Sequence, residues 1–360
     1  MPRGMSSSVI TMSSRFDAKK ILIILHGSIG DVTRALPLAN VLRRGFPGAT
    51  LAWAVEPAAL PLVQHHAAID EVILFDRSRW WKELWPFLRR IRTRRFDLVL
   101  DLQRHFKSGF ISRWSGAPNR LGFNKRDAKE FNWIFNNRFI PMLGDSVSKL
   151  DHYLKFAEYL GIEPYPIEWN IDLTVEEQAR VDRLVANSNG AFAVLFVGSR
   201  WESKRWFPVQ IAECARMIRE RFSLGVVFLG NGQDEPFAKE AEEISEIEVI
   251  NLTGRTSLRD AVGIIARARI AVGPDTGLMH LAAAVGTPVV SLWGATSPAR
   301  TGPYGFDELA IQGKAPCAPC YLKQCPIGRI CMQSIGVEEI RAKLDIVLSR
   351  PDSKVVSRVH

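Results

Sequence analysis

The chain has 360 residues, of which 47% are hydrophobic and 24% are charged, with 26 Gly and 20 Pro spread along it. This composition excludes a disordered or low-complexity protein, and the length exceeds what one hydrophobic core normally serves, so two domains are expected. No apolar run approaches the roughly 18 residues of a membrane span. The net charge of +9 favours an anionic partner, namely a phosphorylated substrate, an anionic lipid or nucleic acid, but no nucleic-acid motif is visible.

The N-terminal residues 1–18 are polar and rich in serine, without an apolar core of signal-peptide length. We therefore expect a disordered tail on a cytoplasmic protein. The first half then alternates short apolar runs with helical patterns, which predicts a parallel sheet flanked by helices. The runs expected to form strands are 21–25, 50–55, 72–75 and 98–102.

The second half repeats this α/β plan after a proline-containing stretch, 161–172, that is typical of a linker. Its expected strands are 192–197, 225–229, 248–251, 269–272 and 288–292, and its expected helices are 208–221, 235–245, 258–268 and 276–285. The predicted organisation is a first Rossmann-like domain over 19–165, a second over 166–345, and a C-terminal tail over 346–360. Two such domains in tandem leave a cleft between them.

The turn after the first strand carries Gly27, Gly30 and Asp31. Its glycine spacing differs from the dinucleotide fingerprint G-x-G-x-x-G, which argues against a nicotinamide cofactor. The two glycines would let a ligand approach the backbone closely. Asp31 faces the predicted cleft and is a candidate catalytic residue; the alternative is that it caps the following helix.

A strand, a tight turn and a helix start follow one another around Asp275, Thr276 and Gly277. Asp275 or Thr276 can cap this helix, and its first N–H groups, with the positive end of the helix dipole, form a seat for an anion such as a diphosphate. His280, about one turn further on, should point back to the same place. The alternative is that Asp275 and Thr276 only cap the helix and that His280 is a core histidine.

Two further turns follow strands of the second half. Ser199 with Lys204 and Arg205 offers a hydroxyl and two cations that suit phosphate, or else forms an exposed basic loop. The turn that ends at Glu235 offers a carboxylate for ribose hydroxyls, or else a helix cap.

An aromatic cluster precedes an arginine-rich helix end in the first half. Trp80, Trp81, Trp85 and Phe87 come before Arg89, Arg90, Arg92, Arg94 and Arg95. Basic and aromatic residues together favour contact with a membrane interface, and the alternative is a solvated helix face.

Four cysteines lie close together in the second half: Cys317, Cys320, Cys325 and Cys331. In a cytoplasmic protein this clustering favours zinc or an iron–sulfur centre over disulfides. The spacing matches no standard zinc site, so a reduced structural loop is preferred over a bound metal.

The order of these motifs resembles that of the bacterial heptosyltransferases of lipopolysaccharide core synthesis, glycosyltransferase family 9. The matching residues are Gly27 to Asp31 with Ala35, Leu36 and Pro37; Lys204, Arg205, Trp206 and Pro208; and Gly273 through Asp275-Thr276-Gly277-x-x-His280 to Gly305. The resemblance covers residues 19–345, and the four-cysteine loop is similar to one in many members of that family.

The resemblance implies a GT-B fold and transfer of heptose from ADP-heptose, with inversion, to Kdo-lipid A or heptosyl-Kdo-lipid A. It implies that Asp31 is the general base and that the second domain holds the nucleotide sugar, through Ser199, Lys204, Glu235, Asp275, Thr276, Gly277 and His280. No cofactor is implied. Metal-dependent glycosyltransferases commonly carry an Asp-x-Asp pair, and this chain has none.

The acceptor implied by the resemblance is an acidic lipopolysaccharide precursor at the inner face of the inner membrane. Gly30, Arg104, Lys107 and Arg120 are expected to face it, since basic residues suit its carboxylates and phosphates. Three alternatives remain open: a family 9 transferase for another acceptor, a nucleotide-sugar epimerase, and a non-catalytic glycolipid-binding protein.

Overall fold

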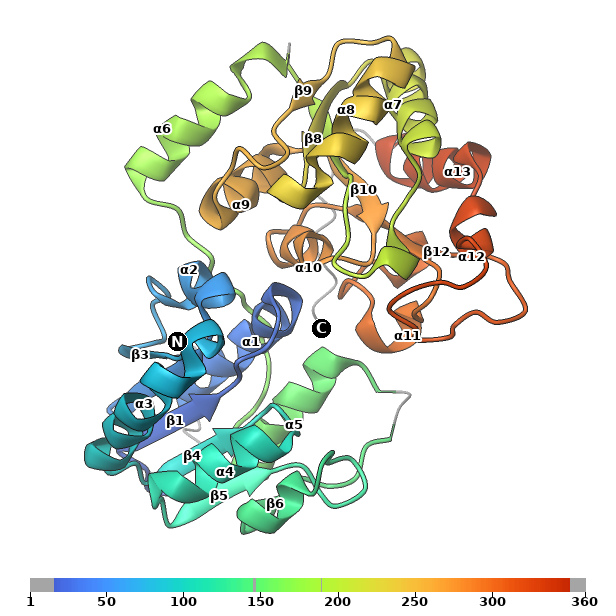
Figure 1. The fold of residues 1–360 in the computed structure, drawn as a ribbon. Coiled ribbons are helices and arrows are strands. Elements are labelled where there is room, and N and C mark those ends of the chain that lie inside the picture. The colour runs from blue at the N-terminus through green and yellow to red at the C-terminus, as the bar shows by residue number, and fades with distance from the viewer. Residues whose placement is uncertain (1–15, 145–146, 189, 350–360) are drawn as a thin grey trace, which may run out of the picture.

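The computed structural model describes residues 16–144, 147–188 and 190–349. Each half of the chain contains a six-stranded sheet whose strands all run parallel, with helices on both faces (Figure 1). The predicted α/β fold, with two Rossmann-like domains, is therefore confirmed. The predicted tails fall mostly outside the described residues, although the last helix, Val337–Leu348, continues beyond the expected boundary at 345.

The first sheet has the strand order β3-β2-β1-β4-β5-β6, the order of a dinucleotide-binding sheet. Its strands are β1 Lys20–Ile24, β2 Thr50–Val55, β3 Glu71–Leu74, β4 Leu98–Asp101, β5 Asn119–Gly122 and β6 Arg138–Phe139. The last two strands were not predicted. They form one edge of the sheet, where β5 begins with two polar residues and β6 is short and exposed, so neither leaves an apolar run.

Helices cover both faces of this sheet. They are α1 Ile29–Gly45, α2 Leu60–Val63, α3 Trp80–Arg94, α4 Phe106–Ser115 and α5 Lys149–Leu160, with 3-10 turns η1 Pro57–Ala59, η2 Arg77–Arg79 and η3 Asn132–Phe135. α1 and α5 pack on the face that carries Ile21 and Ile23, and α3 and α4 pack on the opposite face with Leu22 and Ile24. This alternation is the period-2 pattern of a strand buried on both sides.

The second sheet has the order β12-β11-β10-β7-β8-β9. Its strands are β7 Phe192–Phe196, β8 Gly225–Leu229, β9 Ile250–Asn251, β10 Ile270–Pro274, β11 Val289–Trp293 and β12 Ala310–Gln312. Its helices are α6 Val175–Leu184, α7 Pro208–Phe222, α8 Glu235–Ser245, α9 Leu258–Arg267, α10 Gly277–Ala284, α11 Pro298–Thr301, α12 Ile330–Gln333 and α13 Val337–Leu348, with η4 Ala186–Ser188, η5 Glu202–Lys204, η6 Gly232–Asp234 and η7 Asp307–Leu309. The short edge strand β12 was not predicted.

The connection between the sheets, 161–174, has no regular structure, and its middle part lies against the first half. Asn40 of α1 donates its side-chain amide to the carbonyl of Glu168 at 2.6 Å, and Arg44 pairs with the Glu168 carboxylate at 2.9 Å. These contacts hold the connection along α1 and fix where the second half begins.

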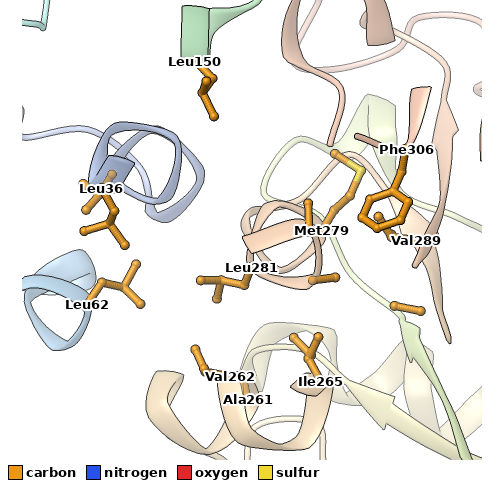
Figure 2. Close-up of a cluster of buried hydrophobic side chains, with 14 of the residues drawn as sticks. Leu36, Leu62, Leu150, Ala261, Val262, Ile265, Met279, Leu281, Val289 and Phe306 are labelled. Carbon is orange, nitrogen blue, oxygen red and sulfur yellow. The ribbon is translucent and has the colours of Figure 1, made fainter. Parts of the chain in front are cut away.

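An apolar contact joins the two halves. Figure 2 shows Leu36 of α1 and Leu62 of α2 facing Leu281 of α10 and Val262 of α9. All four side chains are almost fully buried, and burying a leucine stabilises a fold by about 1.5–3 kcal/mol. The contact therefore sets the starts of α1 and α10 beside each other. Among the described residues, no helix is long and apolar enough to cross a bilayer.

Candidate active site

Asp31 lies in the first turn of α1, but Ser28 is the residue that caps this helix: its Oγ accepts from the N–H of Asp31 at 3.3 Å. The carboxylate of Asp31 is therefore available for other contacts. Its Oδ1 accepts from Nη2 of Arg34 and from Nζ of Lys149, each at 2.8 Å, and its Oδ2 accepts from the Ser28 hydroxyl at 3.0 Å. The capping alternative for Asp31 is thus wrong.

The two cations control the charge of Asp31. Burial by itself would raise the pKa of this carboxyl, but Lys149 and then Arg34 outweigh burial and hold the pKa far below its ordinary value. Asp31 is consequently ionised at every physiological pH. Its side chain retains 22% exposure, so the carboxylate is reachable from the cavity beside it.

This cavity, of about 110 Å³, opens at the ends of the first-half strands β1 and β4. Most of its polar lining is basic: Arg104, His105, Lys129, Lys149, His152 and Arg300, with Asp31 as its carboxylate. Arg300 comes from α11, so the second half contributes to the lining. A cavity with this charge suits a ligand that carries carboxylates or phosphates.

The predicted acceptor residues have different places. Arg104 lines the cavity and lies over the ring of Phe123, 5.0 Å from its centroid. Arg120 instead donates to the carbonyls of Phe135 and Ala117, at 3.0 and 2.6 Å, and does not line this cavity.

Lys107 is exposed on α4, and Gly30 is buried; neither lines this cavity. A Cβ on Gly30 would lie 2.5 Å from Cδ2 of His280. The glycine is therefore required by the opposite half of the protein, and not by a ligand as the sequence analysis proposed.

A second cavity, of about 320 Å³, lies between the halves. The first half lines it with Arg34 and the start of α5, and the second half with α11, Gly302, Tyr304 and Asp307. Lys149 and Arg300 line both cavities, so the two spaces meet at these cations.

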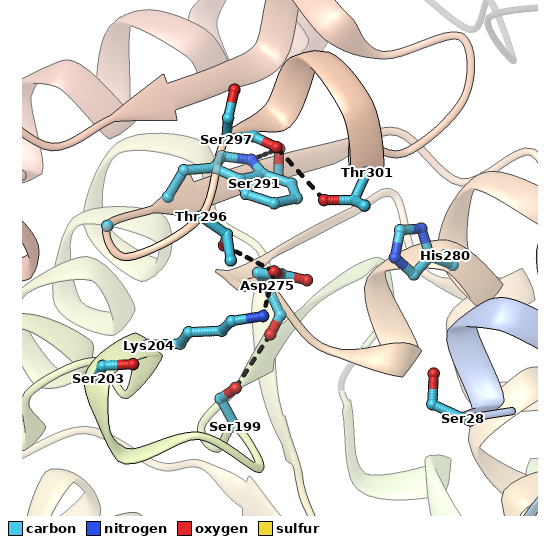
Figure 3. A network of polar contacts seen from close by, with 12 residues as sticks. Ser28, Ser199, Ser203, Lys204, Asp275, His280, Ser291, Thr296, Ser297 and Thr301 are labelled. Atoms are coloured by element: carbon cyan, nitrogen blue, oxygen red, sulfur yellow. Dashed lines mark hydrogen bonds and ion pairs between the residues drawn. The ribbon is translucent and has the colours of Figure 1, made fainter. Parts of the chain in front are cut away.

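Lys204 and Asp275 form the centre of a polar network in the second half (Figure 3). Nζ of Lys204 donates to Oδ2 of Asp275 at 2.5 Å, and the hydroxyl of Thr296 donates to the same oxygen at 2.8 Å. Ser199 donates its hydroxyl to the carbonyl of Asp275 at 3.0 Å. Asp275 thus holds Lys204 in place beside the start of α10, and neither of the two cavities described above includes this pair.

The start of α10 faces the start of α1. Thr276 is its N-cap residue, but its side chain makes no capping hydrogen bond, so the first N–H groups of the helix lack a side-chain cap. A Cβ on Gly277 would lie 3.0 Å from Cβ of Ile29. The predicted anion seat is therefore adjacent to the helix turn that carries Asp31.

His280 joins the halves. Nη1 of Arg34 donates to Nε2 of His280 at 2.5 Å, and burial, followed by Arg34, lowers the pKa of this imidazole well below its ordinary value. Figure 3 shows His280 apart from the Lys204 network, on the side where Ser28 of the first half lies. The histidine points to α1 rather than to the anion seat predicted for it.

Comparisons with known proteins agree with this geometry. The family description "Glycosyltransferase family 9 (heptosyltransferase)" matches residues 84–331. The chain belongs to glycosyltransferase family 9. It is 31% identical to lipopolysaccharide heptosyltransferase 1 of Pseudomonas aeruginosa over 319 residues, which cover 85% of this chain and 87% of the relative. The sequence resemblance is thereby confirmed, and the protein is a glycosyltransferase.

Solved structures show the same GT-B fold as this family 9 glycosyltransferase. The ADP-heptose lipopolysaccharide heptosyltransferase II of Escherichia coli matches with a TM-score of 0.72 at 23% identity, over 93% of this chain and 100% of the other. An Escherichia coli heptosyltransferase solved with ADP matches with a TM-score of 0.68 at 22% identity, over 91% of this chain and 97% of the other.

An epimerase shares this fold more distantly. A putative UDP-N-acetylglucosamine 2-epimerase from Listeria monocytogenes matches with a TM-score of 0.52 at 14% identity, over 94% of this chain and 90% of the other. The two-domain plan alone therefore does not separate a transferase from an epimerase, and the family membership decides for the transferase.

Glu235 and Arg205, two further residues predicted for the nucleotide site, each contact another residue of the protein. Glu235, the first residue of α8, is partly exposed and pairs with Lys239 at 3.0 Å. Asp234 beside it is buried, and a Cβ on Gly198 would lie 1.9 Å from its carboxyl carbon. Arg205 donates to the carbonyl of Ser199 at 3.1 Å and lies over the ring of Phe237. Arg205 thus stabilises the loop that contains Ser199 and Lys204.

The four clustered cysteines are free thiols. Cys317 is exposed, Cys320 and Cys325 are partly buried, and Cys331 is buried. Across the part of the chain that the structure describes, no three or more His, Cys, Asp or Glu side chains are arranged to hold a metal ion. Cys325 Sγ instead accepts from the N–H of Arg329 at 3.1 Å, within the loop.

The sequence analysis missed four residues of the site: Arg34, Lys149, Thr296 and Arg300. Arg34 carried a usable signal, because it lies one helical turn after Asp31 and such residues contact each other. Lys149 is 118 positions from Asp31 and reaches it only through the packing of α5 on α1, so local spacing held no signal for it. Thr296 lay within the family motif but without an assigned role.

Proposed function

We propose that this family 9 enzyme transfers heptose from ADP-heptose, with inversion and without a metal ion, to the inner core of lipopolysaccharide, either Kdo-lipid A or heptosyl-Kdo-lipid A. The observation that carries this proposal is the position of the Asp31 carboxylate, which lines a basic cavity and belongs to the helix turn whose Ile29 lies against the start of α10. The base that takes the proton of the acceptor and the site that binds the leaving diphosphate then lie on opposite sides of one interface between the halves.

The acceptor hydroxyl loses its proton to Asp31 as it attacks the anomeric carbon. A carboxylate with so low a pKa is a weak base on its own. An acceptor that carries carboxylates or phosphates draws Lys149 towards itself, which weakens the Lys149–Asp31 contact and raises the pKa of Asp31. Acceptor binding thereby activates the base. The distance of 2.8 Å between Lys149 and Asp31, and the place of Lys149 in both cavities, support this step.

The leaving diphosphate gains negative charge as the sugar bond breaks. Lys204 and the N–H groups at the start of α10 are fixed donors of the kind that stabilise such charge. Asp275 and Thr296 hold this arrangement in place, so Asp275 acts by positioning Lys204. The absence of an Asp-x-Asp pair from the sequence is consistent with donors of this kind replacing a metal ion.

Further assignments follow from the same proposal. Glu235 is partly exposed at the start of α8 and is the proposed partner of the ribose hydroxyls, with Ser199 supporting the Asp275 turn. Arg104 and Arg300 are the proposed contacts of the acidic acceptor. The protein is proposed to be cytoplasmic and to contact the inner face of the inner membrane, where a lipid-linked acceptor lies.

The decisive experiment incubates the protein with ADP-heptose and heptose-deficient lipopolysaccharide and measures ADP release together with the mass of the acceptor. We expect ADP to be released and the mass of the acceptor to increase. The anomeric configuration of the new bond should be opposite to that of the donor. The same turnover is expected in EDTA, with a melting curve recorded alongside because loss of a structural metal would unfold the protein.

Three outcomes would contradict the proposal. Conversion of ADP-heptose without acceptor would indicate an epimerase. ADP binding without any turnover would indicate that this transferase uses another acceptor. A loss of activity in EDTA that magnesium or manganese restores, at an unchanged melting temperature, would contradict the metal-independent mechanism.

A further inference from the structure

The outer face of helix α4 has the reverse of the usual polarity. Its buried side consists of three serines, Ser108, Ser112 and Ser115, with Gly109 and Ile111, whereas Phe106, Phe110 and Trp114 are exposed. A surface helix normally buries its apolar residues and exposes its polar ones. This helix is therefore built to present aromatic rings outward.

A buried polar network accounts for the serine side of α4. Ser112 donates to Oδ1 of Asn136 at 2.7 Å, and Asp101, at the end of β4, accepts from the side-chain amides of Asn132 and Asn136 at 2.6 and 3.3 Å. These bonds fix η3 against α4. The exposed rings consequently sit on a rigid support and cannot turn inward without breaking satisfied buried hydrogen bonds.

Four exposed rings and one half-buried ring form a continuous aromatic strip, which we define as Trp85, Trp114, Phe110, Phe135 (the half-buried ring) and Phe106. The centroids of successive rings are 5.9, 6.0, 6.5 and 5.0 Å apart. The strip crosses from α3 over α4 to η3, and Figure 1 shows these elements on the part of the first domain away from the second sheet. Contiguous exposed apolar area of this kind marks an interaction surface.

Basic residues flank the strip: Lys82, Arg89, Lys107 and Arg113, all exposed. Within the described chain, no carboxylate lies within salt-bridge distance of any of these four. On α3, Trp81 and Trp85 share a face with Arg89, since these positions recur every four residues. Aromatic rings flanked by lysine and arginine match the lipid interface, where rings lie at headgroup level and cations meet anionic lipids.

The strip ends at the acceptor cavity. Phe106, its last residue, follows His105, which lines the cavity together with Arg104. Glu130 connects the end of the strip to the cavity lining, because it accepts from the N–H of Phe106 at 3.2 Å and lies 3.2 Å from Nδ1 of His105. If the strip inserts into a bilayer, the mouth of the cavity therefore lies at the level of the lipid headgroups.

We infer that the α3–α4 face docks on an anionic bilayer and presents the acceptor cavity to a lipid-linked substrate. The inference rests on the proposed function only for the substrate, since docking itself requires neither donor nor acceptor. A second copy of this chain is the other occupant to consider. Two copies meeting through this face would bring two basic surfaces together, which repel each other, whereas anionic lipid is complementary in charge.

The test measures flotation of the full-length protein with vesicles of phosphatidylglycerol and phosphatidylcholine, and with pure phosphatidylcholine vesicles. We expect binding to the anionic vesicles that falls as salt rises, because exposed charges are screened over about 10 Å at 0.1 M. The variant Lys82→Glu/Arg89→Glu should lose at least about 30-fold in vesicle affinity, since each cation near the surface contributes on the order of one kilocalorie per mole.

The variant Trp81→Ala/Trp85→Ala tests the aromatic contribution, and we expect about a 10-fold or larger loss in affinity. The matched control is Tyr321→Ala/Lys323→Glu, which removes an exposed ring and an exposed cation from the second half and should bind like the wild type. ADP release on a soluble, delipidated acceptor should be unchanged in both α3 variants, Lys82→Glu/Arg89→Glu and Trp81→Ala/Trp85→Ala. This separates docking from catalysis, because a failure of the proposed function would remove turnover without affecting vesicle binding.

Three results would overturn the inference. The first is a wild-type protein that does not bind anionic vesicles. The second is a control variant that loses as much affinity as the α3 variants. The third is a change from dimer to monomer in Trp81→Ala/Trp85→Ala, measured by light scattering, with vesicle binding unchanged; this would assign the face to contact between copies.

Discussion

Nζ of Lys149 lies 2.8 Å from Oδ1 of Asp31, although 118 residues separate them in the chain. Lys149 is the first residue of α5, and Asp31 lies in the first turn of α1, so the contact exists because these two helices pack side by side on one face of the first sheet. A second cation, Arg34, contacts the same oxygen. The proposed base is therefore controlled by a neighbour from a distant part of the chain.

Replacing Asp31 with Asn keeps the shape of the side chain but removes the proton acceptor. We expect kcat to fall by roughly 10²–10⁴-fold, the usual contribution of a positioned acid or base. The affinity for ADP should stay nearly constant, because the proposed diphosphate site lies in the other half. Stability should fall by about 1–3 kcal/mol, since Lys149 and Arg34 lose a charged partner.

Steady-state kinetics, ADP titration and chemical denaturation of Asp31→Asn beside the wild type check this prediction. A variant that keeps its turnover and loses only stability would show that Asp31 serves the fold, and the mechanism would then lack its base.

Removing Lys149 should make the activity sensitive to acid. In the wild type, Lys149 and Arg34 hold the pKa of Asp31 far below its ordinary value, so lowering the pH to 5 leaves this carboxylate ionised. In Lys149→Met the pKa rises, because burial remains and the larger opposing charge is gone. We therefore expect kcat/KM of the variant to decline as the pH falls from 7 to 5, with a much flatter wild-type profile.

The matched control for this experiment is Lys155→Met. Lys155 lies on the same helix and pairs with Glu158 at the surface, at 2.6 Å. Its removal should leave the pH profile unchanged. Profiles of Lys149→Met and wild type with the same slope would show that Lys149 does not set the protonation of Asp31.

Much of the fold could be predicted from the sequence because the central strands are buried on both faces. β2 and β8 begin and end at the residues predicted for them, since each is a continuous apolar run between turn residues. The edge strands β5, β6 and β12 could not be found in this way. They are short and partly exposed, and pairing with a neighbour alone defines them.

The candidate site was predicted only where its residues follow strands. Asp31, Lys204 and Asp275 lie in the segments that follow buried strands, at the edge where a parallel sheet places its ligands. Arg300 instead enters through packing between distant segments, which no local spacing records. The glycine at position 30 was read as space for a ligand, but the imidazole of His280 fills that space. A glycine in the sequence indicates that a neighbouring group comes close to the backbone, but it does not show whether that group is a ligand or another side chain.

Lys204→Ala should weaken donor binding as well as turnover. A hydrogen bond to a charged group contributes about 1.5–3 kcal/mol, so we expect ADP affinity to fall by about 10- to 150-fold. Arg205→Ala is the matched control, because Arg205 lies next in the chain but donates to the Ser199 carbonyl and packs on Phe237. That control should lose stability and keep most of its ADP affinity. Calorimetric titration with ADP measures both, and equal affinities for Lys204→Ala and wild type would remove Lys204 from the diphosphate site.

The last prediction concerns the stability of the fold in acid and rests on His26, between the rings of Phe75 and Phe87. Burial, followed by the charge of Arg77, lowers the pKa of this imidazole to about 4. In the unfolded chain its pKa is near 6.5, so below that pH the unfolded state binds a proton that the native state does not. The free energy of unfolding therefore falls as the pH drops from 7 towards 4, and His26 accounts for about 2 kcal/mol of this loss at pH 5.

The variant His26→Phe removes the titrating group and keeps an aromatic ring in the cluster. No hydrogen-bond partner is lost at Nε2, which has none within the described chain. We expect the unfolding free energy of the variant to drop by about 2 kcal/mol less than that of the wild type between pH 7 and 5, as measured by denaturant titration at both values. The control is His65→Phe, at an exposed histidine, which should keep the wild-type pH dependence. The same pH dependence in His26→Phe and wild type would mean that His26 is protonated without cost in the native protein, and the acid sensitivity would then belong to the other buried histidines, His66, His152 and His280.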